Sequence, residues 1–343
     1  MGNCTRDKLG QDRLAAVQIG PHALPNGVLL APMSGVTDRA FRDLAHTLGA
    51  GLVISEMVAS EHLVTEKHDA RRKARPGDCK PFVIQLAGCE ARWMSEGARV
   101  AEGLGADIID INMGCPAREV TGKLSGSALM RNLDHARSLI EAVVGAVTVP
   151  VTLKMRLGWD HSTLNAPELA RLAQASGVQL LTVHARTRCQ FFKGNADWRQ
   201  VRRVKDAVRI PVVINGDIVC PATARVALEA SGADAVMVGR GAYGGPWMLG
   251  RIAADLATGI DPGSPSLSQQ SAIAIAHVEA ILEQDGPVHG LRNARKHVGW
   301  YLASSGQKPD TVKAWRQRLC TSDRARDVLV GLGTFYAQAQ EAA

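Results

Sequence analysis

The stretch "PVVINGDIVCPATARVALEASGADAVMVGRG", residues 211–241, decides the fold, because it contains the pattern that repeats along most of the chain. It begins and ends with short apolar runs, at 211–217 and 233–241, and a longer segment with helical spacing lies between them. Runs that are apolar at successive positions are typical of parallel strands covered on both faces. The stretch therefore predicts one strand–helix–strand unit of a parallel sheet.

The same pattern occurs eight times between residues 27 and 241. The runs lie at 27–35, 51–57, 81–88, 106–114, 150–158, 180–186, 211–217 and 233–241. Eight strand–helix units predict an α/β fold of the closed (β/α)8 (TIM) barrel type. A doubly wound open sheet has the same alternation, but the chain lacks an early GxGxxG turn, which favours closure. In the first unit, we expect a helix with Thr37 as N-cap that stops at Gly49.

The pattern changes after Asp255. Residues 258–268, "TGIDPGSPSLS", are rich in turn formers and predict a linker, and four segments with helical spacing follow. We therefore expect a catalytic barrel over 1–258 and a small all-helical domain over 268–343. Residues 286–326 hold nine Lys and Arg against two Asp, which equals the net charge of +7 of the whole chain. This charge favours an anionic partner, with nucleic acid the leading candidate.

Composition excludes several classes of protein. The apolar stretches are too short to cross a bilayer, and the first residues carry charges where a signal peptide needs an apolar segment. We therefore expect a cytoplasmic protein without a membrane partner. The seven cysteines form no CxxC pair, so neither a disulfide framework nor a metal site is indicated.

Polar or turn-forming residues close most of the apolar runs. They are Pro32, Met33, Ser34, Gln85, Asn112, Cys115, Lys154, Arg156, His184, Arg186, Asn215, Gly216, Asp217, Gly239 and Arg240. Any one of them alone is equally well explained as a hydrogen-bonded polar group at the barrel mouth. Because the active site of such a barrel lies at the carboxyl ends of its strands, the set as a whole predicts an active site.

Two features of this set suggest a phosphorylated cofactor. Gly216 and Gly239 follow the last two runs and expose backbone N–H groups, and Arg240 adds a bidentate donor where such barrels usually hold phosphate. Lys154, pointing into the mouth, could place positive charge near an electron-rich ring and stabilise its reduced form. A phosphate site, an interior lysine and amide side chains suggest FMN.

These residues lie in motifs that resemble a known family. The motifs are "APMSGVTDRAFR", "SEM", "QLAG", "DINMGCPAREVTGKLSGSALM", "VTLKMRLGW", "TVHARTR", "VVINGDI", "VGRGAYGGPW" and, in the helical region, "ARKHVGWYL". They closely resemble the tRNA-dihydrouridine synthases, most nearly the bacterial B-type branch. The resemblance covers nearly the whole chain apart from the first dozen residues, and the signature around Cys115 is its most specific part.

The resemblance implies an activity and a cofactor site. The implied reaction is reduction of the C5=C6 bond of a uridine in the D-loop region of tRNA, with hydride from reduced FMN and with NADPH as electron donor. By the same resemblance, Pro32, Met33 and Ser34 line the flavin site, Gln85 and Lys154 meet the ring system, and His184, Asn215, Gly216, Asp217, Gly239 and Arg240 surround the ribityl phosphate. Ser34 stands where many relatives have alanine, so the hydrogen bonding there differs.

Cys115 lies between a glycine and a proline at the end of a run. Hydride addition at C6 leaves negative charge on C5 and O4 of the base, and a proton must follow. A thiol is mostly protonated at neutral pH yet acidic enough to donate to carbon, so Cys115 is expected to be the general acid. The alternative for a free cysteine is a small buried hydrophobe, which the flanking Gly114 and Pro116 disfavour.

A uridine in folded tRNA must leave its stack to reach a flavin, so positive charge should surround the mouth. Three basic segments are candidates: Lys67 to Arg75, Arg186 to Lys193, and 286–326. Arg295 and Lys296, within the family motif, are the expected RNA contacts, together with Arg186. Asn112 is expected to hydrogen-bond the uracil edge. Trp300 and Tyr301 could either stack on bases or pack a helical core.

Two other functions fit part of the pattern. A flavin barrel that reduces a free pyrimidine would share the strand-end residues, but the basic helical region argues against it. A non-catalytic RNA-binding barrel would share the basic region, but an intact Cys115, Lys154 and Arg240 argue against that.

Overall fold

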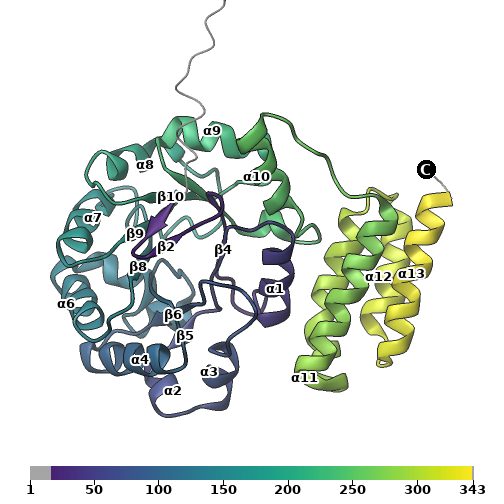
Figure 1. The fold of residues 1–343 in the computed structure, drawn as a ribbon, viewed down its shortest axis with the longest axis horizontal. Helices are drawn as coiled ribbons and strands as arrows, with labels where there is room; N and C mark the ends of the chain where they lie inside the picture. Colours follow the sequence, from purple (N-terminus) through teal and green to yellow (C-terminus); the bar gives the residue numbers. More distant parts are fainter. Residues whose placement is uncertain (1–16, 342–343) are drawn as a thin grey trace, which may run out of the picture.

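The computed structural model describes residues 17–341 and contains a parallel barrel followed by a helical bundle (Figure 1). The barrel strands are β3 (Val28–Leu30), β4 (Leu52–Val53), β6 (Val83–Ala87), β7 (Ile108–Met113), β8 (Val151–Arg156), β9 (Leu180–His184), β10 (Val212–Asn215) and β11 (Ala235–Val238). Each of the eight predicted runs therefore contains a strand. A further short strand, β5 (Val58–Ala59), pairs with β6.

The sheet closes on itself. Its order is β4-β3-β11-β10-β9-β8-β7-β6-β5, and all of these strands pair in parallel. A parallel bridge between Ile54 and Val83 joins the end of β4 to β6, and the N–H of Ser55 donates to the carbonyl of Val83 over 3.1 Å. The predicted barrel is confirmed, and the open sheet is not what forms.

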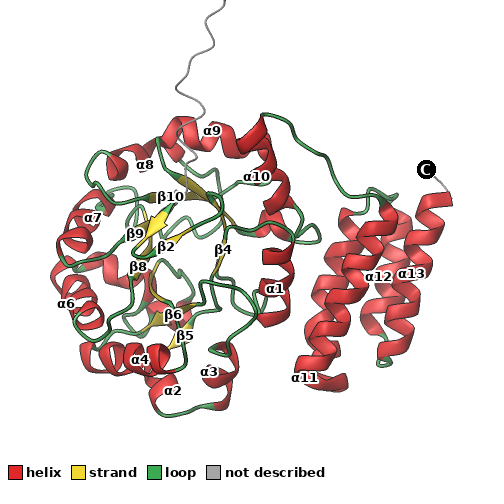
Figure 2. Cartoon of the chain, in the orientation of Figure 1, coloured by secondary structure: helices red, strands yellow, loops and turns green. Residues whose placement is uncertain are grey.

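Helices cover the outside of the barrel (Figure 2). They are α1 (Arg39–Thr47), α2 (Ser60–Val64), α3 (His68–Lys73), α4 (Ala91–Gly103), α6 (Leu133–Val144), α7 (Ala166–Ala175), α8 (Trp198–Lys205), α9 (Pro221–Ser231) and α10 (Met248–Thr258). The short helix α5 (Arg118–Thr121) and the 3₁₀ turn η3 (Gly126–Arg131) lie in the segment after β7, and the 3₁₀ turn η4 (Arg240–Ala242) follows β11. The N-cap of α1 is Asp38, whose carboxylate accepts from the N–H of Phe41, so the expectation for Thr37 is wrong. The Thr37 hydroxyl instead accepts from the N–H of Met33.

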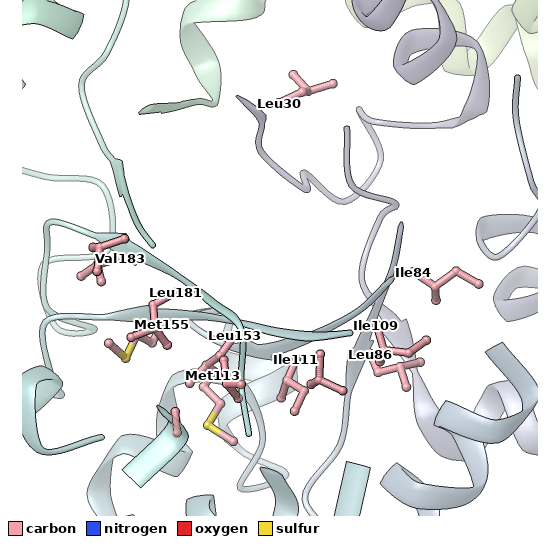
Figure 3. Close-up of a cluster of buried hydrophobic side chains, with 14 of the residues drawn as sticks. Leu30, Ile84, Leu86, Ile109, Ile111, Met113, Leu153, Met155, Leu181 and Val183 are labelled. Atoms are coloured by element: carbon pink, nitrogen blue, oxygen red, sulfur yellow. The ribbon is translucent and has the colours of Figure 1, made fainter. Parts of the chain in front are cut away.

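Alternate residues of each strand face opposite sides. On β7, Ile109, Ile111 and Met113 point outward and join the large core between strands and helices, part of which Figure 3 shows. Ile108, one position earlier, belongs to the smaller core inside the barrel. Asp110 and Asn112 have the same parity as Ile108, so polar side chains continue the interior column toward the carboxyl end.

A short antiparallel hairpin, β1 (Gln18–Ile19) and β2 (His22–Ala23), precedes the barrel and was not predicted. Ile19 and Leu24 are fully buried in the interior core, together with Leu180 of β9 and Val213 of β10. Since these residues lie at the amino ends of the strands, the hairpin closes the end of the barrel opposite to the mouth. Two-residue strands give too little periodicity to be found from sequence.

Beyond residues 259–266, three elements form the helical bundle: α11 (Leu267–Ser304), α12 (Pro309–Thr321) and α13 (Ala325–Glu341). Two predicted segments merge in α11, which turns sharply at Gly286 (φ 76°, ψ 170°) before Pro287. Its halves form a hairpin, because the Nδ1 atom of His277 lies 3.0 Å from the Tyr301 hydroxyl. No described helix is long and apolar enough to span a membrane.

The bundle packs directly on the barrel (Figure 1). Its core includes Ala40 of α1 and Trp247, and the rings of Tyr243 and Trp300 stack with centroids 3.9 Å apart. Gly244 has a φ of +65°, and a Cβ there would collide with the carbonyl of Trp300. The loop after β11 and the second half of α11 therefore pack backbone against backbone.

Candidate active site

Cys115 lies in the turn that follows β7, at the barrel mouth. It is half-buried, and the N–H and hydroxyl of Ser127 both donate to its carbonyl, over 3.0 and 2.8 Å. Burial raises the pKa of the thiol, although an N–H bond from Ala117 and the charges of Arg156 and Lys154 oppose this. The thiol is therefore protonated at neutral pH and has two cations near it.

The oxygen of Asn112 holds this turn from below. It accepts from the N–H of Gly114 over 3.1 Å and from the N–H of Cys115 over 2.9 Å. The amide nitrogen of Asn112 donates to Gln85 Oε1 over 2.7 Å, and Gln85 Nε2 donates to Asp110 over 2.7 Å. Gln85 and Asp110 are buried. Gln85 and Asn112, which were expected to contact cofactor and base, thus form one network with the cysteine turn.

Arg156 holds the same turn from the side. Its Nε donates to the carbonyl of Gly114 over 2.7 Å, and its Nη1 donates to the carbonyls of Thr187 and Phe191 over 2.9 and 2.8 Å. Only 1% of Arg156 is exposed. No carboxylate of the described chain lies within ion-pair distance of this guanidinium, so its charge remains available to a neighbouring anion.

Lys154 points into the mouth as expected. It is buried, and its ammonium donates to Asn215 Oδ1 over 3.2 Å. The amide nitrogen of Asn215 donates to the carbonyl of Met237, which turns its oxygen toward the lysine. Burial and the charge of Arg156 lower the pKa of Lys154 to about 8, against the opposing charge of Asp110. Asn215 Oδ1 is the only hydrogen-bond acceptor of the Lys154 ammonium among the described residues. Two of the three N–H groups of the ammonium are therefore left for a ligand.

His184, at the end of β9, lies against Gly216, the glycine that follows β10. Burial, with the charges of Arg156 and Lys154, lowers the pKa of its imidazole well below the ordinary value. A Cβ at Gly216 would lie 3.0 Å from its Cδ2 atom, and Gly216 has a φ of +118°. Any larger residue at position 216 would therefore press against the neutral imidazole of His184, and glycine avoids this contact.

The loops after β10 and β11 offer a cradle of donors. The backbone N–H groups of Gly216, Asp217, Gly239 and Arg240 meet no acceptor within the described residues. The Arg240 guanidinium is half-exposed and lies 3.7 Å from Asp217. A Cβ at Gly239 would lie 3.7 Å from the sulfur of Met33, so the Pro32-Met33-Ser34 segment after β3 borders the same cradle.

Arg186 lies beneath the cradle and is only 2% exposed. Its Nη2 donates to both oxygens of Asp217, over 2.7 and 2.6 Å, and to the carbonyl of Gly194. Although partial burial acts to raise it, the hydrogen bonds from Arg186 and from the N–H of Ala196 hold the pKa of Asp217 below its usual value. The guanidinium thus supports Asp217, and its contacts within the protein leave it little access to RNA.

Arg295 and Lys296 point in different directions. Arg295 Nη2 donates to the carbonyl of Ser322 and, over 2.6 Å, to Asp323, so it ties α11 to the turn between α12 and α13. The Lys296 ammonium lies beside the loop after β3, where a Cβ at Gly35 would be 3.9 Å from it. Of the two, the structure brings only Lys296 to the rim of the mouth.

Other basic residues also divide into two groups. In the segment from Lys67 to Arg75, Arg71 pairs with Glu66, and Arg72 and Lys73 pair with Asp69. By contrast, six exposed residues of the bundle have no ion-pair partner within 17–341: Arg292, Lys308, Lys313, Arg316, Arg318 and Arg326. Lys67, Arg75 and Lys193 of the other two basic segments are also exposed without an ion-pair partner within the described residues, so the unpaired positive charge is concentrated on the bundle but is not confined to it. Trp300 and Tyr301 pack the domain contact and the bundle core, which is the second of the two roles considered for them.

Two residues of the mouth escaped the sequence analysis. Asp110 lies inside an apolar run. A charged residue at a position expected to be buried indicates a polar contact in the interior, and this signal in the sequence would have identified it. Phe192 is half-exposed, with the guanidinium carbons of Arg156 and Arg240 at 5.5 and 5.2 Å from its ring centre. Its loop position gave no periodic signal.

The described chain contains no cluster of three or more residues suited to hold a metal.

The fold and the mouth define the class of the chain: it is a (β/α)8 barrel whose polar side chains gather at the carboxyl ends of the strands, where enzymes of this fold have their active sites. Comparison with family models narrows the class. The chain belongs to the dihydrouridine synthase (Dus) family, whose model matches residues 29–337. The match runs from the first barrel strand nearly to the end of the bundle.

Curated relatives are similar over most of their length. "Probable tRNA-dihydrouridine synthase" of Rhodobacter capsulatus is 57% identical over 280 residues, which cover 81% of this chain and 86% of that protein. A protein of the same name from Rickettsia conorii is 52% identical over 292 residues, covering 84% and 88%. "tRNA-dihydrouridine synthase B" of Pseudomonas syringae pv. tomato is 46% identical over 292 residues, covering 85% and 87%. The resemblance found in the sequence is confirmed.

Solved structures share the fold at low identity. Histamine dehydrogenase from Rhizobium sp. 4-9 matches with a TM-score of 0.57 and 15% identity, covering 96% of this chain and 65% of that chain.

Proposed function

We propose that the chain is a tRNA-dihydrouridine synthase that uses FMN and NADPH to reduce the C5=C6 bond of a uridine in tRNA. The names of its relatives support this function. The observation that carries it is the protonated thiol of Cys115, which shares one mouth with a buried lysine and a cradle of free N–H donors.

The residues at the mouth fit a phosphorylated flavin. Four backbone N–H groups without protein acceptors, with Arg240 beside them, suit a phosphate. The free N–H groups of Lys154 suit the electron-rich ring, and His184 and Asn215 lie between the two ends. Pro32, Met33 and Ser34 border the site, and Gln85 underlies it. When bound, the flavin supplies the hydride that reaches C6 of the base.

The chain contributes the proton. Negative charge left on C5 and O4 of the base is neutralised when Cys115 donates its proton to C5. Burial keeps the thiol protonated until then, and the charges of Arg156 and Lys154 stabilise the thiolate that remains. Arg156 and Asn112 fix the turn on both sides, so the thiol is held in place before substrate arrives.

Asn112 can offer the base only a donor. Both lone pairs of its oxygen are used by the N–H groups of Gly114 and Cys115, and one amide hydrogen is used by Gln85. The remaining N–H suits a carbonyl oxygen of uracil and not its N3–H group.

The bundle is the RNA-binding part of the enzyme in this proposal. Its six exposed, unpaired basic residues give the surface that phosphate contacts need, and Lys296 extends it to the mouth. Arg295 supports this surface indirectly, because its hydrogen bond to Asp323 ties α11 to the turn between α12 and α13. A reductase of free pyrimidines would not need such a surface, and an RNA-binding barrel without catalysis would not need the Cys115 turn.

The test separates flavin reduction from proton donation. In Cys115→Ala, we expect normal flavin content and normal anaerobic flavin reduction by NADPH, but dihydrouridine formation in a tRNA transcript at least about 100-fold slower, because only the general acid is lost. Cys189→Ala, which removes an exposed thiol from the loop after β9, is the matched control and should leave both rates unchanged. Equal dihydrouridine formation by Cys115→Ala and the control would overturn the assignment. Activity on free uridine but not on tRNA would favour the other reductase.

A further inference from the structure

A buried chain of hydrogen bonds connects the barrel interior to the cysteine turn. The Thr152 hydroxyl donates to Asp110 over 2.6 Å, and Gln85 Nε2 donates to the other carboxylate oxygen over 2.7 Å. Gln85 then accepts from Asn112, whose oxygen accepts from the N–H groups of Gly114 and Cys115. The groups come from β6, β7 and β8, which are neighbours in the sheet.

The two ends of this chain determine its direction. The backbone N–H groups can only donate, so Asn112 must present its oxygen to them and its nitrogen to Gln85. Gln85 must then present its oxygen to Asn112 and its nitrogen to position 110. Burial raises the pKa of Asp110, and the hydrogen bonds from Gln85 and Thr152 oppose this shift. Because its oxygens accept both of these hydrogen bonds, Asp110 completes the sequence without a conflict. The buried position of Asp110 leaves no water to repair a mismatch.

We propose that Asp110 is a positioning residue that acts through Gln85 and Asn112 to hold the Cys115 turn in place. Asp110 does not touch the turn itself. The proposed function enters this inference only as the purpose of the turn, because the hydrogen-bond coupling exists with or without flavin and tRNA.

The network predicts how substitutions at positions 110 and 112 combine. Asp110→Asn alone is mild, because the new amide can still turn its oxygen toward Gln85 while the Thr152 hydroxyl accepts from its nitrogen. Asn112→Asp alone creates a conflict, because carboxylates then flank Gln85 on both sides and its single amide nitrogen satisfies only one of them. The combination Asp110→Asn with Asn112→Asp removes the conflict, since Gln85 can reverse and donate to the carboxylate at position 112.

The test is hydrogen exchange of the Gly114 and Cys115 amides at pH 7.5, measured by mass spectrometry on the protein without flavin or tRNA. In Asn112→Asp we expect exchange about fivefold faster, which corresponds to about 1 kcal/mol, the usual net contribution of one hydrogen bond. Adding Asp110→Asn should restore the exchange rate to within about twofold of the unmodified protein.

The matched control adds Asp255→Asn to Asn112→Asp. Asp255 is a buried carboxylate on α10 that pairs with Arg225, far from the network in sequence and on the outer face of the barrel. This control has the same net charge as the double variant, and it should exchange as fast as Asn112→Asp alone. If Asn112→Asp does not fold, recovery of folded protein by Asp110→Asn and not by Asp255→Asn is the equivalent result.

Additive effects at positions 110 and 112, or equal rescue by Asp255→Asn, would overturn the proposal. Neither result depends on turnover, so the proposal can fail while the proposed function stands. Conversely, a rescued exchange rate in a protein that never reduces tRNA would leave the network intact and remove only the proposed function.

Discussion

The contact between barrel and bundle should be sensitive to acid because of a buried histidine. His277 is 1% exposed, its Nδ1 atom lies 3.0 Å from the Tyr301 hydroxyl, and its ring centre lies 5.3 Å from that of Phe41 on α1. Its Nε2 atom has no hydrogen-bond partner within residues 17–341. Burial, with the nearby charge of Lys296, lowers the pKa of His277 to about 3.

The sign and size of the effect follow from this shift. The unfolded chain binds a proton at His277 near pH 6.5 and the folded chain only near pH 3, so the free energy of unfolding falls as the pH falls through this window. Between pH 7 and pH 5 the loss from His277 alone is about 2 kcal/mol. His297 is also buried, its ring centre is 4.6 Å from that of His277, and its pKa is lowered as well, which adds to the loss.

The assay is urea unfolding followed by circular dichroism at pH 7 and pH 5. In His277→Phe, which keeps an aromatic ring against Phe41, we expect the difference between the two pH values to shrink by about 2 kcal/mol. His289→Gln, at an exposed position of the same helical hairpin, is the control and should leave the difference unchanged. A pH dependence equal in His277→Phe and the unmodified protein would refute the reasoning.

Two further predictions concern the domain contact and the mouth. In Gly244→Ala, the added Cβ collides with the carbonyl of Trp300. We therefore expect the free energy of unfolding, measured by thermal unfolding, to fall by about 2–4 kcal/mol, and proteolysis within residues 259–266 to become faster. Gly263→Ala, also at positive φ but with no atom within 4 Å of its Cβ, should lose only about 1 kcal/mol. At the mouth, Lys154 loses its charge above about pH 8, so FMN affinity measured by fluorescence quenching should fall above that pH, and this pH dependence should vanish in Lys154→Met. An FMN affinity that is constant up to pH 10 would contradict the role of Lys154.

The fold was predictable because it depends on repetition. Eight apolar runs separated by helical segments admit few topologies, and every run contains a strand. What sequence could not give was local geometry. Both Thr37 and Asp38 are good N-cap residues, and only the hydrogen bond to Phe41 shows that Asp38 fills the position. The hairpin at Gln18 to Ala23 is too short to leave a periodic pattern.

The site was predictable as a set of residues but not as a set of contacts. Positions at strand ends predict that Lys154, Asn215 and Arg240 share one mouth, because parallel strands end at the same edge. They do not predict that Arg186 is turned inward to Asp217, since a guanidinium after a strand can equally face solvent. Arg295 and Lys296 are adjacent in sequence, yet a helix separates neighbours by about 100°, so only one reaches the mouth.

Charge balance connects the fold to the chemistry of the mouth. Lys154 and Arg156 are buried, and Asp217 is already occupied by Arg186, while Asp110 receives the bonds of Gln85 and Thr152. Burying a cation without a paired anion is costly, and this cost lowers the pKa values of Lys154 and Arg156. A ligand that brings negative charge, such as a phosphorylated cofactor or the developing charge of the reacting base, relieves the same cost. The excess of positive charge at the mouth thus lowers the stability of the free protein. The same charge favours binding of an anionic cofactor and stabilises the negative charge of the transition state.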